Sequence, residues 1–508
     1  MFYSLLFKDK KDKGRKKLED VEFFRDLNLD QMITSLTSLK KEHNLNEFFY
    51  VFPSSVEETK YRQDISRDLE NEEVFHSVRE FSMKMQRARK YQNYANKLVY
   101  KYQKERWFVD SARVYVEAVN TLKMDLSSLK INSEGFKEFK RYLNEYVNSE
   151  AFKDLASQVS SILDELSAIE YTIFIKENTI KVQKYKGEKD YAEEVLKTFE
   201  RFKQTNVKDY NVEFDEFMEM NHVEAKILDL VAKLYSHEFS ELDLFYVKYA
   251  SYMDKTIVRF EREVQFYISY LEYVKPLKES GLKFCYPEFT TSKQVYASEA
   301  FDVVLAKKMQ NEGSTIICND FHLNKKERIL VVTGPNQGGK TTFARMIGQI
   351  HYLGRMGYPV PAKKARLMFF DKILSHFERE ERAENLRGKL EDDLIRIKKI
   401  LDAATSSSIV LMNEIFSSTT LDDALFLTKK VVERIIESDS LAVLVTFLYE
   451  ISSMNDKVVS MVSTVSQENP EIRTYKIVRM PSNGLSYAIS LARKYGLTYD
   501  QLMERIDV

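Results

Sequence analysis

The stretch Gly334-Pro335-Asn336-Gln337-Gly338-Gly339-Lys340-Thr341 follows an apolar run, Ile329-Leu330-Val331-Val332, and precedes residues 342–347, which have the composition of a helix start. A strand, a glycine-rich turn and a helix in this order are what a phosphate-binding P-loop requires. Its glycines let backbone N–H groups turn inward around an anion, and the positive end of the helix dipole adds to the attraction. The stretch, which we call the glycine loop, therefore predicts a nucleotide site; a glycine-rich turn without a ligand is the alternative.

The residue types in the glycine loop predict separate roles in binding ATP and Mg²⁺. Lys340 is expected to reach the β- and γ-phosphates, where it also serves catalysis, and Thr341 is expected to ligate Mg²⁺. The predicted nucleotide contacts are Gly334, Pro335, Asn336, Gln337, Gly338, Gly339, Lys340, Thr341 and Thr342.

A second motif is expected downstream of the loop, in the form of an apolar strand that ends in acidic residues. Ser408-Ile409-Val410-Leu411-Met412-Asn413-Glu414 fits this pattern, with Asn413 where an aspartate usually stands. Asn413 can hydrogen-bond a Mg²⁺-bound water but contributes no charge, and it is the second residue predicted at the metal position. Glu414 is the candidate for polarising the attacking water, with an ordinary strand-end carboxylate as the alternative.

Composition narrows the class of protein. The chain of 508 residues is long enough for about three domains. Its 77 basic and 78 acidic residues leave a net charge of -1, which gives no support for nucleic-acid binding through bulk charge but is compatible with a local basic face. No stretch is long and apolar enough to predict a membrane span. The two cysteines, Cys285 and Cys318, predict core residues in a reducing cytoplasm rather than a disulfide framework.

Glycine and proline divide the chain into two parts. Eleven of the 14 glycines lie from Gly281 onward, and no proline occurs between Pro53 and Pro276. The first part therefore predicts long amphipathic helices, over residues 72–104, 149–169, 191–202 and 223–274. The second part alternates helical segments with short apolar runs such as Val443-Leu444-Val445, which indicates an α/β layer. The predicted fold class is a multidomain α plus α/β protein.

One segment of the first part predicts a β-hairpin instead of a helix. Residues 171–175 and 179–186 are rich in β-branched and aromatic side chains and flank the short polar turn Lys176-Glu177-Asn178. Lys176, Lys181, Lys184 and Lys186 make the segment basic. It could contact a nucleic-acid backbone, or it could be a packing platform between helices with solvated lysines.

The glycine loop and its surroundings resemble the MutS family, whose loop reads GPNxGGKST where residues 334–342 here read GPNQGGKTT. The match continues through Gly357 and Val360-Pro361-Ala362, and residues 413–424 resemble the family's DEIGRGTSTFDG. Residues 388–394 stand where the family has STFxxEM, and the segment from Ser486-Tyr487-Ala488 to Gly496-Leu497 resembles its SYG motif. The resemblance covers about residues 313–508.

The resemblance implies a long-helix lever and clamp region followed by a P-loop ATPase domain of the ABC type. The interval between Lys340 and Asn413 is too short for a long coiled-coil insertion, so the helical part precedes the ATPase entirely. The implied order is a basic N-terminal tail (1–20), a helical lever or core region (21–130), a clamp-like helical insertion with the hairpin near 171–186 (131–245), a return helix of the lever (246–284) and the MutS-like ATPase domain (285–508).

MutS-like ATPases dimerise so that each nucleotide lies between two subunits, which implies a homodimer through the ATPase domain. The family's signature serine, which reaches the partner's γ-phosphate, is replaced here by Gly388, and its Thr-His pair is Thr446-Phe447. Together with Asn413, three polar or charged groups are missing, so ATP binding and dimer closure are expected to persist while hydrolysis is slow. Ile316 and Ile317 stand where the family packs adenine, although strand core is an equal alternative.

The mismatch-recognition domains of the family, with their Phe-x-Glu wedge, have no counterpart in the expected organisation. Phe-x-Glu occurs at Phe214/Glu216 and Phe217/Glu219, where it reads as core phenylalanines beside solvated carboxylates. The chain is therefore not expected to discriminate mismatched from matched duplex.

Three functions remain open on the sequence. The first is an ATP-dependent clamp on DNA that is structured or branched rather than mispaired. The second is the same ATPase moving its helical arms around a ribosomal or protein partner. The third is a nearly inactive regulatory nucleotide-binding subunit, favoured by Asn413, Gly388 and Phe447. None of the three places the protein in a membrane.

Overall fold

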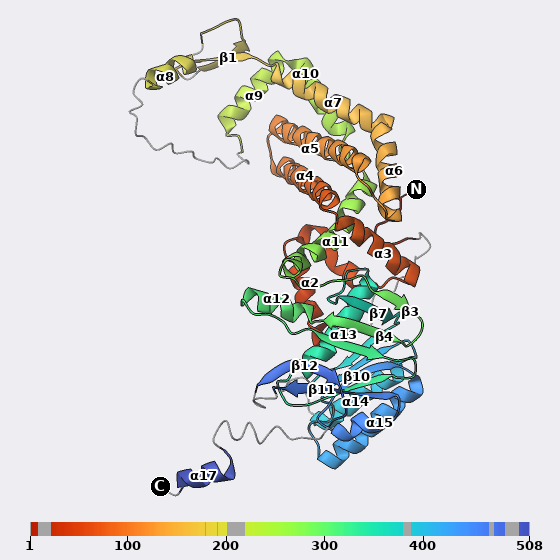
Figure 1. The fold of residues 1–508 in the computed structure, drawn as a ribbon. Coiled ribbons are helices and arrows are strands. Elements are labelled where there is room, and N and C mark those ends of the chain that lie inside the picture. The colour runs from red at the N-terminus through yellow and green to blue at the C-terminus, as the bar shows by residue number, and fades with distance from the viewer. Residues whose placement is uncertain are drawn as a thin grey trace. The chain divides into compact units, whose positions relative to one another are not determined.

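The computed structural model describes residues 2–8, 22–177, 179–189, 191–200, 219–378, 388–466, 472–482 and 497–506 (Figure 1). The chain forms two compact units. Unit 1 comprises Met1–Phe2, Asn71–Asn132 and Phe136–Glu261, and unit 2 comprises Tyr3–Glu70, Ser133–Gly135 and Arg262–Val508. The fold is thus mixed, with helices and several sheets, as the sequence predicts.

Unit 1 consists of long helices and one β-hairpin. Its elements are α4 (Glu72–Lys97), α5 (Lys101–Ser128), α6 (Glu134–Asn148), α7 (Glu150–Ser167), β1 (Tyr171–Lys176), β2 (Thr179–Lys184), α8 (Tyr191–Glu200), α9 (His222–Leu234), α10 (Ser236–Lys248) and the first turns of α11 (Lys255–Glu279).

Two of the four predicted helical segments of unit 1 are broken, whereas residues 149–169 and 191–202 contain the single helices α7 and α8. A single helix over residues 72–104 is wrong, because the chain reverses at Leu98–Tyr100 and α4 and α5 lie side by side (Figure 1). Each of the two helices has a buried apolar stripe, and the reversal lets the stripes bury each other. The predicted helix over 223–274 is likewise three helices, α9, α10 and α11. No glycine or proline marks these breaks, so local propensity could not reveal them.

The hairpin forms from the two segments in which strands are predicted. β1 and β2 pair antiparallel, with Tyr171 opposite Lys184 and Lys176 opposite Thr179. Glu177 turns the chain with a φ of 54°. Side chains directly opposite each other share a face of the hairpin, so the register decides which residues act together.

Unit 2 combines helices with two sheets. Its helices are α1 (Glu22–Asp26), α2 (Leu29–Thr37), η1 (Lys41–His43), η2 (Leu45–Tyr50), α3 (Val56–Leu69), the rest of α11, α12 (Val303–Asn311), α13 (Lys340–Met356), α14 (Lys389–Ala403), α15 (Leu421–Ser438), η3 (Tyr449–Ser453) and α17 (Tyr499–Ile506). Its strands are β3 (Glu288–Thr290), β4 (Val295–Ala300), β5 (Asn319–Leu323), β6 (Ile329–Thr333), β7 (Lys364–Met368), β8 (Ile373–His376), β9 (Ile409–Asn413), β10 (Leu441–Val445), β11 (Val458–Val465) and β12 (Arg473–Arg479).

The larger sheet has the strand order β12-β11-β6-β10-β9-β8. All of its neighbouring strands pair in parallel except β12, which is antiparallel to β11. Ile329 and Val331 of β6 belong to a core shared with α14, α15 and η3, whereas Leu330 faces the side of α13. Strands covered on both faces read as unbroken apolar runs, which explains the sequence of β6. The smaller sheet has the order β3-β7-β4-β5.

Helix α13 is buried along almost its whole length between the larger sheet and the rest of unit 2. Gly348 allows the close approach, because a Cβ there would stand 2.7 Å from Leu411 Cδ1 of β9 and 2.6 Å from Leu27 Cδ1. Gly357 ends the helix with a φ of 89°, and Tyr358 N–H then donates to Leu353 O. The helix that follows the glycine loop is therefore held rigidly. No helix in the described part of the chain is both long and apolar enough to cross a membrane.

His351 on α13 predicts a pH dependence of stability. Its Nδ1 lies 2.7 Å from Ile347 O, and its buried Nε2 has no hydrogen-bond partner among the described residues. Burial lowers the pKa of His351 to about 4, whereas the unfolded chain takes up the proton near the ordinary value of 6.5. The unfolded state therefore binds more protons between these two values, so stability falls as the pH falls through this window.

At pH 5 the loss due to His351 is about 2 kcal/mol relative to pH 7. His351→Leu should remove this part of the pH dependence of the free energy of unfolding, measured by urea denaturation at both pH values. His237→Leu, on the exposed surface of α10, is the control and should leave it unchanged. The same pH dependence in His351→Leu and the parent chain would contradict the prediction.

Candidate nucleotide-binding site

The glycine loop connects the end of β6 to the start of α13 and adopts a conformation that needs glycine. Gly334 and Gly339 have φ values of 121° and 87°, which side chains rarely allow. At Gly338 a Cβ would collide with the Ser463 hydroxyl of β11. Ser463 Oγ in turn donates to Gly338 O at 2.7 Å. The neighbouring strand thus fixes the shape of the loop.

Lys340 places its ammonium group inside the loop. Its Nζ donates to Gly334 O at 3.1 Å, Pro335 O at 3.0 Å and Asn336 Oδ1 at 3.3 Å. Burial lowers the pKa of Lys340, and the Glu414 carboxylate, with Oε1 4.0 Å from Nζ, opposes that shift. A buried cation is stabilised here by oxygen atoms, and phosphate oxygens would suit it in the same way.

The start of α13 offers backbone donors at the same place. The first N–H groups of a helix have no partner within the helix. The N-cap residue is Gly339, which has no side chain to accept from them. These N–H groups and the Lys340 ammonium therefore favour an anion at the helix start.

Thr341 and Asn413 meet although they are far apart in sequence. Thr341 Oγ1 donates to Asn413 Oδ1 at 2.8 Å, and Asn413 is the last residue of β9, buried at 7% exposure. Both oxygen atoms are hard ligands of the kind that Mg²⁺ prefers, so the two residues fit the predicted metal position. The described residues contain no group of three or more His, Cys, Asp or Glu side chains that could hold a metal ion.

Glu414 follows Asn413 directly and turns toward the loop. It has a φ of 52°, and its N–H donates to Val445 O at the end of β10 at 2.9 Å. Gln337 and Tyr475, which line the same cavity, also have positive φ values, of 60° and 55°. Backbone held in this region costs energy and is common at functional sites.

A cavity of about 770 Å³ adjoins the glycine loop, within the range of small-molecule sites. It brings together nearly all the predicted contact residues, including Asn336 to Thr342, Glu414 and Ile317. Ile317 is 44% exposed, so it is a wall of the cavity and not strand core. Gly334, Pro335 and Asn413 border the site through their contacts with Lys340 and Thr341.

Several residues of the site were not singled out from the sequence. Ser463 supports the loop, Tyr475 lines the cavity, and Arg473 Nε lies 3.3 Å from Asn336 O. Asn319 holds the Tyr475 segment in place by donating to Tyr475 O and accepting from Ile477 N–H. These residues come from β5, β11 and β12, whose spacing along the chain contains no signal of their meeting.

Two of the three positions that depart from the MutS pattern, Gly388 and Phe447, lie outside the cavity lining, whereas the third, Asn413, borders the site. Gly388 is the N-cap of α14, and a Cβ there would meet no atom within 4 Å. Phe447 follows β10 and is 49% exposed. The Phe214 and Phe217 motifs and the region from Ser486 to Gly496 lie outside the described residues, as does most of the basic tail.

Comparison with known proteins supports the resemblance. A model of MutS domain V matches residues 330–505. The chain is 26% identical over 294 residues to the DNA mismatch repair protein MutS of Clostridium kluyveri, a match that covers 56% of this chain and 33% of that protein. For the protein of the same name from Syntrophomonas wolfei the identity is 25% over 297 residues, covering 57% and 34%.

A third relative, the DNA mismatch repair protein MutS of Chlorobium phaeovibrioides, is 29% identical over 235 residues, covering 45% of this chain and 26% of that protein. The matches thus span about a third or less of the relatives' length. The site geometry and these matches lead to the same result, and the chain is a MutS-like protein.

Proposed function

We propose that this chain binds ATP and Mg²⁺ at the glycine loop, pairs with a second copy of itself through the same region, and acts on structured or branched DNA as a slow ATP-driven clamp. The observation that carries the proposal is the convergence of Lys340, Thr341, Asn413 and Glu414 beside one cavity. Residues 285–508 are the proposed ATPase domain. Residues 21–130 with 246–284 and residues 131–245 are the proposed lever and clamp.

Binding of the phosphates would use groups that are already in place. Lys340 would exchange loop carbonyls for oxygens of the β- and γ-phosphates, and the N–H groups at the start of α13 would add neutral donors. Ile317 and Tyr475 would flank the base. Mg²⁺, held through Thr341 and Asn413, would neutralise phosphate charge during transfer.

Hydrolysis would depend on Glu414, which is positioned to accept a proton from an attacking water. Slow hydrolysis is proposed because Asn413 supplies no negative charge at the metal position. Phe447 and Gly388 also supply no imidazole or hydroxyl at the positions that the family uses.

Dimerisation is proposed from the resemblance and from exposed apolar surface close to the site. Phe447 follows β10, and the strands β6, β9 and β10 are parallel, so Phe447 emerges at the same edge of the sheet as the glycine loop. A large apolar side chain exposed at this edge is a feature that a second copy would cover.

Contact with DNA is proposed for the basic hairpin of unit 1. The register places Phe174 opposite Lys181 and Lys176 opposite Thr179, so both lysines and an exposed aromatic ring share one face. Lysines there would neutralise backbone phosphates without reading the bases.

The first prediction concerns ATP binding. Lys340→Ala should weaken ATP affinity by about 100-fold or more. Among the described residues, Lys340 supplies the only ammonium group inside the loop, and the substitution removes it. Isothermal titration with ATP and Mg²⁺ measures this. Lys363→Ala, which breaks an exposed pair with Glu299, is the matched control and should bind normally. Unchanged affinity in Lys340→Ala would place the nucleotide elsewhere.

The second prediction concerns turnover, where two neighbouring substitutions should act in opposite directions. Glu414→Gln should lower the steady-state rate of phosphate release by about 100-fold or more while ATP affinity is retained. Asn413→Asp should raise the rate, because it restores a negative charge beside Thr341. Normal turnover in Glu414→Gln would remove Glu414 from the proposed role.

The third prediction concerns DNA. The double variant Lys176→Gln/Lys181→Gln should bind duplex and four-way-junction DNA more weakly, and the slope of log affinity against log salt should fall by about 2. Lys429→Gln/Lys430→Gln on α15, which belongs to unit 2, removes the same charge without altering the hairpin and serves as control. Titrations on matched and mismatched duplex should agree with each other. An unchanged salt slope in the hairpin variant would exclude the hairpin as a phosphate contact.

A further inference from the structure

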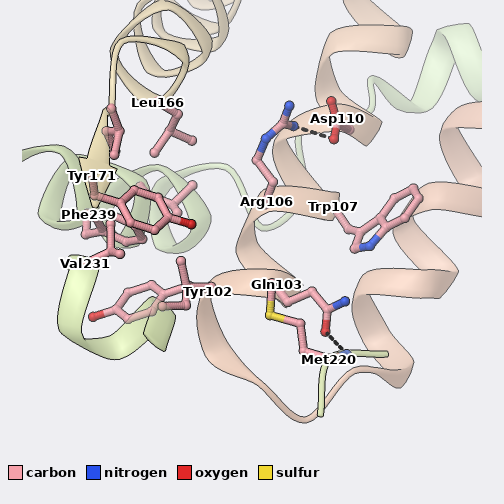
Figure 2. A pocket seen from close by; sticks show the side chains of 13 residues that line it. Tyr102, Gln103, Arg106, Trp107, Asp110, Leu166, Tyr171, Met220, Val231 and Phe239 are labelled. Carbon is pink, nitrogen blue, oxygen red and sulfur yellow. Dashed lines mark hydrogen bonds and ion pairs between the residues drawn. The ribbon is translucent and has the colours of Figure 1, made fainter. Parts of the chain in front are cut away.

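A second cavity, of about 290 Å³, lies wholly within unit 1 (Figure 2). Its walls come from α5, the end of α7, the start of β1, and α9 and α10. None of the residues that line it belongs to the glycine loop or to the cavity beside that loop. The nucleotide site of unit 2 therefore does not account for it.

The walls of this cavity are rich in aromatic rings. Tyr102, Tyr171 and Phe239 lie on one side and Trp107 on the other, with Arg106 and Gln103 between them (Figure 2). Tyr102 and Phe239 meet edge to face with centroids 4.7 Å apart, and Trp107 meets Tyr91 and Tyr94 edge to face. Neighbouring rings thus hold these side chains in place, which suits the binding of a flat molecule.

Polar groups of α5 are arranged inside this aromatic cavity. Arg106 forms an ion pair with Asp110, one turn further along the helix. Gln103 Oε1 accepts from Met220 N–H at 3.2 Å, which fixes the carboxamide. The guanidinium of Arg106 therefore stands beside the carboxylate of Asp110 at the cavity wall. Arg106 can donate to an acceptor atom of a ligand, and Asp110 can accept from a donor on the adjacent atom.

The volume limits the size of the ligand. A cavity of about 150 Å³ holds one benzene ring, so a cavity roughly twice as large suits two fused rings. A single ring would leave much of the wall without contact, and a nucleoside triphosphate would not fit inside. Any nucleobase can stack on an aromatic side chain, whatever the nucleotide sequence, and this stacking contributes strongly to binding.

We propose that the unit 1 cavity binds an unstacked purine base, held between the aromatic rings with its hydrogen-bonding edge on Arg106 and Asp110. The base could be part of a free nucleoside or an extrahelical residue of a nucleic acid. The recognition is the same in both cases. The base stacks on the aromatic rings, and its edge offers one hydrogen-bond donor and one acceptor. The proposal does not depend on ATP binding at the glycine loop.

Trp107 is the only tryptophan in the chain, so its fluorescence reports on this cavity alone. Titration of the full chain with inosine should change the Trp107 emission saturably. 1-Methylinosine has the same two fused rings but lacks the N1–H donor, and it should bind more weakly. No response to inosine, or a response to 1-methylinosine at equal or lower concentration, would overturn the proposal.

A matched pair of variants tests the polar contact. Arg106 and Arg113 both pair with Asp110 and are equally exposed, but only Arg106 lines the cavity. Arg106→Met should weaken inosine binding about tenfold or more, whereas Arg113→Met should leave it unchanged. The thermal unfolding midpoint of both variants is measured alongside. If Arg106→Met folds poorly, Tyr171→Ser, on the exposed hairpin, provides a second variant that should lose binding. Equal binding by Arg106→Met and Arg113→Met, or unchanged binding by Tyr171→Ser, contradicts the proposal.

The two sources of the base are separated in a further arm. A duplex with one extrahelical purine is compared with the fully paired duplex of the same sequence and with inosine alone. A Trp107 response at lower concentration for the extrahelical duplex, lost in Arg106→Met, identifies a nucleic-acid base as the ligand. A response to inosine without any difference between the duplexes identifies a free nucleoside.

Discussion

The position of β6 in the middle of a parallel sheet is the constraint on which the rest of unit 2 depends. β6 pairs in parallel with β10 on one side and β11 on the other, and β10 pairs in parallel with β9. The carboxyl ends of these strands consequently share one edge. The glycine loop follows β6, Asn413 ends β9 and Glu414 follows it, so the sheet assembles the site without any direct sequence link between them. Phe447, which comes shortly after β10, lies at the same edge.

Packing and electrostatics reinforce this arrangement. The burial of α13 fixes the direction of the helix start, and Ser463 leaves room only for glycine at Gly338. Lys340 supplies the positive charge inside the loop, and its buried ammonium is stabilised by loop carbonyls and by the nearby Glu414. Asn413 gives Thr341 an oxygen partner but no charge. The same geometry therefore supports the proposal of firm ATP binding and slow hydrolysis. Binding relies on hydrogen-bond donors of the loop that are present, whereas fast hydrolysis would rely on a negative charge that Asn413 does not supply.

Unit 1 carries two features of different chemistry, the basic hairpin and the aromatic cavity. Its helices bury their apolar stripes on one another, but the hairpin exposes Phe174 and Ile175, and the bundle leaves an aromatic cavity beside α5. The hairpin presents lysines suited to phosphates, and the cavity presents rings suited to a base. The two features are distinct in chemistry, since charge governs the first and stacking the second, although Tyr171 contributes to both the hairpin and the cavity.

The sequence by itself determined the elements whose information is local. The glycine loop follows from a strand, a turn and a helix within a short stretch, and the hairpin follows from β-branched residues around a polar turn, so both were predictable from neighbouring residues alone. The reversal at Leu98–Tyr100 was not, because no glycine or proline marks it and it follows from the burial of α4 against α5. Ser463, Asn319 and Tyr475 reach the glycine loop and its cavity from distant strands. Trp107 and Tyr171 line one cavity only through the packing of α5 against other helices. Tertiary structure decided these contacts, because strand order and helix packing depend on the burial of whole apolar faces, which no short stretch of sequence contains.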